Sequence, residues 1–203
     1  MRVLIGMEYS GRGREAFRKK GHDAWSICDC PAEDGSPYHI EGNVLDHLDD
    51  GWDFAVFHPN CTRMTLSGVQ WLYHPEDTHL APVDRRRHPR YPLRMLELLD
   101  DVTVFKALQE CSIPKKVIEN SQPHGLAMGL VGRYTQKVQP WQHGEPFTKG
   151  ACLWLYGVPP LQPSNIVEGR EAACHNASPG IDRWKERSRS YQGIMNAFAE
   201  SWG

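Results

Sequence analysis

Two residues of this chain have side chains and positions suited to covalent chemistry. Cys61 comes shortly after the apolar segment 54–57, and Glu119 directly follows the apolar residues Val117 and Ile118. Both segments are typical of short buried strands, and in an open α/β sheet ligands bind outside the carboxyl ends of the strands. A thiol at an exposed turn there can be held as a thiolate and attack an electron-poor carbon. A partly desolvated carboxyl can keep a raised pKa and donate a proton.

Together the two groups suit a Michael-type addition to a pyrimidine. The thiolate of Cys61 would attack C6, Glu119 would protonate or hydrogen-bond N3, and C5 would become nucleophilic. The competing interpretation is that two unrelated polar residues end their strands, and the pattern alone leaves it open. Cys111 and Cys152 fit the commoner role of a cysteine as a small hydrophobe.

The elements that must position these residues alternate along the chain. We expect strands at residues 2–6, 23–28, 54–57, 117–120 and 151–155, and helices at residues 11–20, 94–109 and 191–202. The first helix should end at Gly21, because glycine is the usual residue just past a helix end. The alternation predicts an α/β fold with a doubly wound, mostly parallel sheet.

Composition fits one domain, or one domain with a small appendage. The chain has 203 residues, 40% hydrophobic and 24% charged, with a net charge of −2. We expect a catalytic core over 1–157, a short insertion over 158–186, and a C-terminal helix over 187–203 that returns to the core. Residues 62–93 are rich in Pro, Arg and His, and we expect a mobile active-site loop there.

The cysteines indicate reduced thiols rather than disulfides. The chain carries six cysteines and no pattern of an export signal or a membrane span. The protein is therefore expected in the cytoplasm, away from membranes. Cys28 and Cys30 lack the spacing of a zinc ribbon, so no metal is expected. The alternative is an improvised site of Cys174 and His175 with His22 or His39.

The first turn after a strand predicts a ligand site at a helix N-terminus. Residues 6–13 read GMEYSGRG and join the first strand to the first helix, which lets glycine backbones approach a ligand. Asp29, at the end of the second strand, is placed to accept hydrogen bonds from ribose hydroxyls. A dinucleotide and S-adenosylmethionine would both fit, and a plain turn with a surface aspartate stays open.

Charge is distributed in two basic runs. Arg85, Arg86, Arg87 and Arg90 form one, and Arg183, Lys185, Arg187 and Arg189 form another around Trp184. Basic residues interleaved with aromatic ones suit a phosphate backbone and unstacked bases. The alternative is that these charges are solvated loop residues.

The ordered set of these motifs resembles the DNA (cytosine-5) methyltransferases, in particular a compact type of phages and mobile elements. The resemblance covers most of the chain. His58-Pro59-Asn60-Cys61, with Ser67 downstream, is similar to the family's nucleophile loop, and Glu119-Asn120 to its Glu-Asn pair. Lys149 stands near its Gln-x-Arg-x-Arg element, and residues 191–197 resemble its closing segment.

The resemblance implies the Rossmann-like fold of S-adenosylmethionine-dependent methyltransferases and a role for each matched position. Catalysis would fall to Cys61, Glu119, Asn120 and Lys149. The cofactor S-adenosyl-L-methionine would contact Glu8, Tyr9, Ser10, Gly11, Gly13, Asp29, Asn43, Val44, Pro59 and Asn196. Double- or single-stranded DNA would contact Ser67, Trp71, Arg85, Arg86, Arg87, Arg90, Arg183, Trp184 and Lys185. The 62–93 loop would then close over a flipped base in a bacterial or phage-infected host cell.

The chain departs from the family in ways that keep other functions open. Asn60 stands in place of a second proline, Asn43 in place of a frequent aspartate, and Lys149 in place of arginine. A large target-recognition domain has no room, so sequence specificity should be short or relaxed, or supplied by a homodimer or an accessory subunit. The alternatives are another Cys61-dependent C5 modification, C4 deamination, or a non-catalytic nucleic-acid-binding relative. An amino-methyltransferase is disfavoured, because the aromatic end of its Asp-Pro-Pro-Tyr motif is missing.

Overall fold

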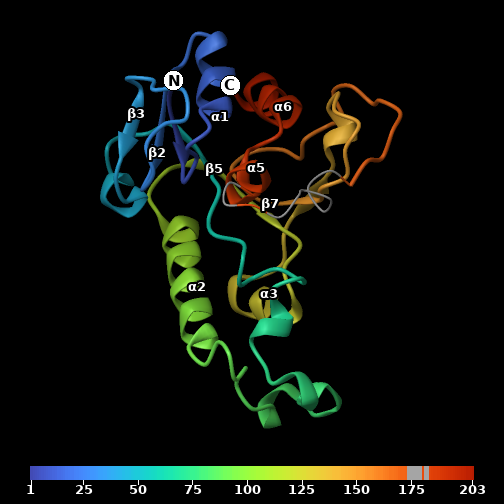
Figure 1. Cartoon of the computed structure of the whole chain (residues 1–203). Helices are drawn as coiled ribbons and strands as arrows, with labels where there is room; N and C mark the ends of the chain where they lie inside the picture. The colour runs from blue at the N-terminus through green and yellow to red at the C-terminus, as the bar shows by residue number, and fades with distance from the viewer. Residues whose placement is uncertain (173–179, 181–182) are drawn as a thin grey trace.

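A seven-stranded sheet forms the centre of the protein (Figure 1). The computed structural model describes residues 1–172, 180 and 183–203, apart from the side chains of Trp184 and Glu186. The strand order is β3-β2-β1-β4-β5-β7-β6. The strands are β1 (Arg2–Gly6), β2 (Asp23–Cys28), β3 (His39–Glu41), β4 (Phe54–Phe57), β5 (Lys115–Ser121), β6 (Gln136–Val138) and β7 (Ala151–Tyr156).

The first five strands are parallel, and β7 runs antiparallel to both β5 and β6. From β1 the chain passes outward to β2 and β3, then returns to β4 on the other side of β1. This reversal is a topological switch point, where an open α/β sheet binds its ligands beyond the carboxyl ends of the strands. The α/β prediction with a doubly wound, mostly parallel sheet is confirmed.

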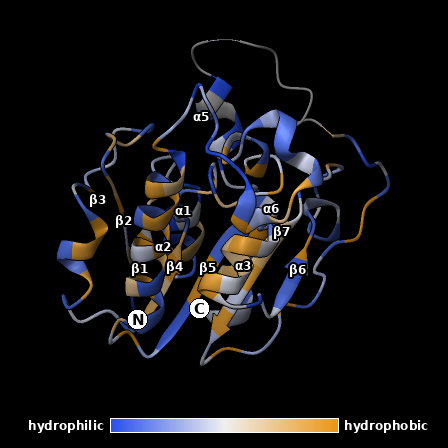
Figure 2. Cartoon of the chain, turned by 90° about the horizontal axis from the view of Figure 1, so that it is seen from below, coloured by the Kyte–Doolittle hydropathy of each residue, from blue (hydrophilic) through white to orange (hydrophobic). Residues whose placement is uncertain are grey.

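Helices cover both faces of the sheet. They are α1 (Arg12–Lys19), α2 (Arg94–Glu110), α3 (Gly125–Val131), α5 (Arg183–Ser188) and α6 (Gln192–Trp202). Alternate residues of β1 point to opposite faces, as expected for a strand. Ile5 therefore packs with Phe17 of α1 and Phe198 of α6, whereas Leu4 packs with Phe105 of α2. In Figure 2 hydrophobic and hydrophilic residues share each of these helices, as this one-sided burial requires.

The end of α1 follows the sequence prediction. Gly21 has φ +84°, the left-handed conformation that glycine adopts readily. The β3 and β6 strands and α3 were not predicted, because each is short and β3 and β6 lie at the edges of the sheet. No helix in the described part of the chain is long and apolar enough to cross a membrane.

The segment 62–93 is more regular than its composition suggests. It contains the short 3-10 helices η2 (Val69–Trp71), η3 (Pro75–His79) and η4 (Pro82–Asp84), and it extends from the sheet beside the start of α2 (Figure 1). The carboxylate of Asp77, buried under this segment, accepts hydrogen bonds from the backbone N–H and the guanidinium of Arg86 at 2.7 to 3.3 Å. An ion pair between the buried carboxylate of Asp77 and the largely exposed guanidinium of Arg86 therefore helps to organise this segment.

Candidate active site

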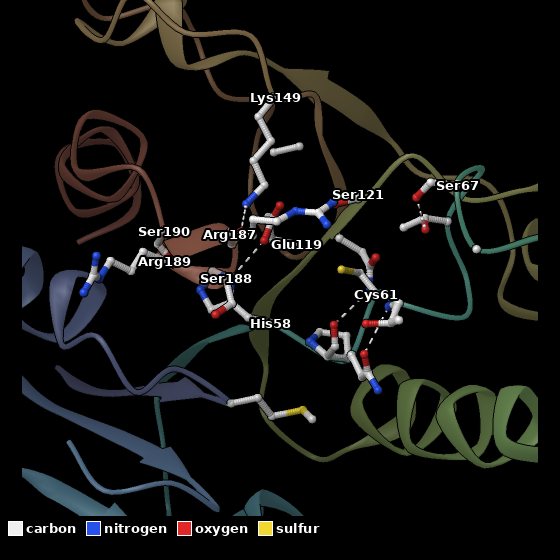
Figure 3. A pocket seen from close by; sticks show the side chains of 18 of the residues that line it. His58, Cys61, Ser67, Glu119, Ser121, Lys149, Arg187, Ser188, Arg189 and Ser190 are labelled. Atoms are coloured by element: carbon white, nitrogen blue, oxygen red, sulfur yellow. Dashed lines mark hydrogen bonds and ion pairs between the residues drawn. The ribbon is translucent and has the colours of Figure 1, made fainter. Parts of the chain in front are cut away.

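A cavity of about 1090 Å³ opens at the carboxyl ends of β1, β4 and β5. Its walls come from the loops after these strands, from the segment before β7, and from α5 and the start of α6 (Figure 3). Many of the residues proposed from the sequence line it: Glu8, Tyr9, Ser10, Pro59, Cys61, Ser67, Trp71, Glu119, Asn120, Lys149 and Arg183, together with Asn60. This volume lies slightly above the range of roughly 300–1,000 Å³ that is typical of small-molecule sites.

Other proposed residues lie outside this lining as the structure describes it. They are Gly11, Gly13, Asp29, Asn43, Val44, Asn196, Arg85, Arg86, Arg87, Arg90 and Lys185. Gly11 and Gly13 still shape the turn that leads into α1. Gly11 has φ +73°, and the Cβ of any other residue there would collide with the guanidinium of Arg14. Asn43 caps η1 (Val44–His47) by accepting a hydrogen bond from the backbone N–H of Leu45 at 3.1 Å.

Asn60 and Asn120 hold the turn that carries Cys61. The Oδ1 of Asn60 accepts a hydrogen bond from the backbone N–H of Thr62 at 3.1 Å, which is the contact of an Asx turn. The Nδ2 of Asn120, on β5, donates to the carbonyl of Pro59 at 3.1 Å. Asn60 therefore supplies by hydrogen bonding a constraint that a second proline would supply covalently.

The expectation that Cys61 is an exposed thiolate is wrong. Cys61 is half-buried, and burial, followed by the negative charge of Glu119, raises the pKa of its thiol. The positive charge of Lys149 and a hydrogen bond with Ser121 act in the opposite direction without cancelling that increase. Cys61 thus carries its proton at neutral pH and needs a base before it can attack.

The expectation of a raised pKa for Glu119 is also wrong. Burial alone would raise the pKa, but the hydrogen bond from His58, the charge of His58 and the charge of Lys149 outweigh it and lower the pKa. The Nδ1–H of His58 donates to Glu119 Oε2 at 3.0 Å. Sequence reasoning missed His58, although its place directly before Pro59 at the end of β4 could have indicated it.

Lys149 connects this site to α5. Its Nζ donates to the backbone carbonyl of Arg187 at 2.7 Å, and the ammonium lies 5.6 Å from the ring centroid of Tyr191 (Figure 3). Its charge acts on both Cys61 and Glu119. Lys149 is therefore the cation of the site, in the role of a point charge rather than a planar fork.

Glu8 is the acidic residue of the turn after β1. It is 4% exposed; its Oε1 accepts hydrogen bonds from the Ser10 hydroxyl and from the backbone N–H of Arg12, the latter at 3.1 Å. Its Oε2 is buried with no hydrogen-bond partner among the described residues. Just before it, Met7 has φ +62°, a conformation uncommon outside glycine that often marks functional sites. The turn thus presents an unpaired carboxylate oxygen beside the cavity.

The two basic runs differ from their sequence interpretation. Arg85 donates to the carbonyls of Leu80 and Thr78, at 2.8 and 3.0 Å, and Arg86 binds Asp77. These two arginines stabilise the segment itself. Arg87 and Arg90 lie on the same segment, where Trp71 lines the cavity and contacts the rings of His88 and Tyr91.

The second basic run lies mainly on α5. Arg183 lines the cavity and Lys185 is exposed, whereas Arg189 binds Glu33 through both carboxylate oxygens. The side chain of Trp184 lies outside the structural description, as do Cys174 and His175 of the alternative metal site. The described residues contain one group of three side chains close enough to share a metal ion, namely Cys28, Asp29 and Cys30.

Comparisons with known proteins bear on the fold. No family model matches the chain, and no curated protein matches it. A solved structure described as a DNA modification methyltransferase encoded within a prophage (E. coli) aligns over 89% of this chain and 56% of its own, with 12% identity and a TM-score of 0.51. The Dnmt2 methyltransferase of S. pombe aligns over 88% of this chain and 54% of its own, with 15% identity and a TM-score of 0.43. The chain thus spans about half the length of these structures. The likeness to the first of them and the mostly parallel sheet show a Rossmann-like α/β fold.

Proposed function

We propose that this protein transfers a methyl group from S-adenosylmethionine to C5 of cytosine in DNA, through a covalent bond between Cys61 and C6. The observation that carries this proposal is the meeting of Cys61 and Glu119 in one cavity, delivered by the neighbouring parallel strands β4 and β5. Phe57 pairs with Ile118, so the residues that follow each strand start from the same edge of the sheet.

The turn after β1 fits the proposed cofactor. The unpaired Oε2 of Glu8 is a buried acceptor beside the cavity, and a positively charged amino group would satisfy it. S-adenosylmethionine carries such a group and, when bound, supplies an electrophilic methyl group. The residues that would hold it are Glu8, Tyr9, Ser10, Pro59, Gly11, Gly13, Asp29, Asn43, Val44 and Asn196.

The chain's own residues account for activation of the base. Asn60 and Asn120 orient the Cys61 turn, so that the thiol faces a pyrimidine from a fixed position. Glu119 lies at the wall of the same cavity and would bind the N3 edge of cytosine. Lys149 offsets part of the negative charge of Glu119 that opposes ionisation of Cys61.

DNA would lie across the mouth of the cavity between the 62–93 segment and α5. Ser67, Trp71 and Arg183 line the cavity, and Arg87, Arg90 and Lys185 lie on the same two segments. We assign phosphate contacts to Arg87, Arg90 and Lys185, and base stacking to Trp71. Arg85 and Arg86 serve the segment's own structure instead.

Domain organisation follows from the same proposal. Residues 1–157 would form the catalytic core, 158–186 a short segment in place of a target-recognition domain, and 187–203 the return to the core. α6 packs on α1, and Lys20 binds Glu200 at 2.7 Å. A chain with so short an insertion would recognise a short or relaxed sequence, unless a second copy or another subunit contributes.

Covalent trapping tests the proposal. DNA containing 5-fluorocytosine blocks release of the adduct, so the wild-type protein with S-adenosylmethionine should form a DNA complex that survives denaturation. Cys61→Ala should abolish that complex, and Cys111→Ala, a half-buried thiol at the end of α2, should leave it unchanged. Binding of DNA without an adduct would overturn the enzyme proposal, and an adduct indifferent to S-adenosylmethionine would favour another pyrimidine modification.

A further inference from the structure

Adduct formation requires two proton transfers that Cys61 and Glu119 cannot make by themselves. The thiol must lose a proton and N3 of the base must gain one. Yet Glu119, with a lowered pKa, is an ionised carboxylate with no proton to donate, and Cys61, with a raised pKa, keeps its own. A further group must take the first proton and provide the second.

His58 is a titratable group that contacts Glu119 and lines the same cavity as Cys61. Its Nδ1–H donates to Glu119 Oε2 at 3.0 Å, which leaves Nε2 as the nitrogen with the free lone pair. That Nε2 is buried and has no hydrogen-bond partner among the described residues. The His58 side chain is 12% exposed and lines the cavity together with Cys61 and Glu119. An imidazole held by a carboxylate through one nitrogen, with the other nitrogen unpaired, is the arrangement of a general base.

The charged and titratable groups around this pair come from several elements. Cys61 follows β4, Lys149 precedes β7, Glu8 follows β1, Arg94 begins α2, and Arg187 lies on α5; all line the same cavity. Within this set, the positive charge of Lys149 lowers the pKa of both Cys61 and Glu119. His58 is the group that contacts Glu119 directly, through the hydrogen bond from its Nδ1–H to Oε2.

The geometry points to His58 and Glu119 acting as one proton carrier between the thiol of Cys61 and N3 of the target cytosine, an assignment that rests on the proposed function. The Sγ–H bond breaks, and Nε2 of His58 takes its proton while the Sγ–C6 bond forms. The C5=C6 electron pair moves to C4–C5 and the C4=N3 pair moves to N3. N3 then takes a proton from Glu119. The His58–Glu119 pair has gained one proton from Sγ and given one to N3, so it ends with the single proton that it held at the start.

In this mechanism His58 is a catalytic residue, because its Nε2 takes the proton of Cys61 and its Nδ1 passes a proton to Glu119. The matched variants are His58→Gln, which keeps an amide donor but cannot carry a proton, and His58→Ala, which leaves space for added imidazole. His22→Asn is the control, because His22 lies beside the N-terminal amino group at the opposite end of β1. All three are compared with wild type by the rate of adduct formation on 5-fluorocytosine DNA between pH 6 and 9.

The expected result is a wild-type rate that levels off with rising pH and a His58→Gln rate that is about 100-fold lower at pH 7. The variant's rate should keep rising about tenfold per pH unit, because ionisation of the thiol itself then limits the reaction. Imidazole should restore part of the His58→Ala rate, and nitrogen-15 spectra of the free protein should show an Nδ1-protonated His58 that is lost in Glu119→Ala, which removes the acceptor.

The contradicting results are distinct for the two proposals. A wild-type pH profile retained in His58→Gln, with no imidazole rescue of His58→Ala, would overturn the proton-carrier assignment while leaving the methyltransferase proposal in place. Absence of any wild-type adduct would overturn the proposed function and this assignment with it. A His58→Gln protein that does not fold leaves the rescue of His58→Ala and the nitrogen-15 spectra to decide.

Discussion

Replacing Glu119 with glutamine should accelerate one reaction of Cys61 and abolish another. Glutamine keeps the size of the side chain but removes its negative charge, which is the second-largest cause of the raised Cys61 pKa after burial. A neighbouring negative charge disfavours the thiolate, so the pKa of Cys61 should fall when that charge is removed. At neutral pH the thiolate fraction, and with it alkylation by iodoacetamide, should rise roughly tenfold.

Covalent addition to DNA should change in the opposite direction. Glutamine can accept the hydrogen bond from His58 but cannot pass a proton to N3, so the adduct rate should fall about 100-fold or more. Since burial still raises the pKa of Cys61 in the variant, the gain in alkylation should stay well below the reactivity of an exposed thiol.

The assay is mass spectrometry of alkylated peptides over pH 6–9, with Cys111 of the same protein as the internal standard. Glu168→Gln, at an exposed position outside the cavity lining, is the matched control and should leave both rates unchanged. Circular dichroism should show that all variants remain folded. Cys61 alkylation that stays constant or slows in Glu119→Gln would refute the electrostatic coupling between Glu119 and the thiol.

Three further outcomes follow from other contacts. Lys149→Met removes a charge that lowers the pKa of Cys61, so alkylation of Cys61 should slow several-fold, measured with the same peptides. The Arg86 hydrogen bond lowers the pKa of Asp77 to about 2, below its value of about 3.9 in an unfolded chain, so the pair stabilises the protein above pH 4 and this contribution is lost as pH falls toward 2. Urea unfolding should therefore show a shallower loss of stability between pH 4 and 2 in Asp77→Asn than in wild type. The ring of Phe198 is fully buried, and its centroid lies 4.8 Å from that of Trp202. Phe198→Ala should therefore lower the free energy of unfolding by about 3–5 kcal/mol, and a loss below about 1 kcal/mol would contradict the packing of α6.

Much of the sheet could be predicted because each central strand carries its own pattern. β1 and β4 are continuous apolar segments, and Gly21 marks the end of α1 by its positive φ. The antiparallel direction of β7 could not be predicted, because direction depends on where the chain enters the sheet and not on the residues of the strand. α3 was missed for a related reason, since seven residues are too few for a clear helical period.

The sequence predicted which residues meet in the site, but not the directions of their pKa shifts. Cys61 and Glu119 follow apolar strands, which is visible in the sequence, and the structure places both at one cavity. The pKa of Cys61 is raised by burial and by the charge of Glu119, whereas that of Glu119 is lowered by His58, at the end of β4, and by Lys149, before β7. Such neighbours are set by tertiary contacts, so strand-end position alone led to the wrong direction for Glu119.

The basic runs show the same limit. Arg86 looks like a DNA contact in a run of arginines, but it binds Asp77, nine residues earlier in the chain and buried. A lone aspartate in a polar segment does not reveal that it will be buried, because burial follows from how the 3-10 helices pack. For Arg87 and Arg90, contact with DNA stays a prediction.

The central claim is that Cys61 and Glu119 place a methyl group on C5 of cytosine, and the most direct test is mass spectrometry of the nucleosides of cells that express the protein. This measurement identifies the product even when the target sequence is unknown. We predict 5-methylcytosine in DNA with the wild-type protein and background levels with Cys61→Ala at equal expression. Unmodified cytosine in both samples, or 5-methylcytosine that persists in the Cys61→Ala sample, would contradict this claim.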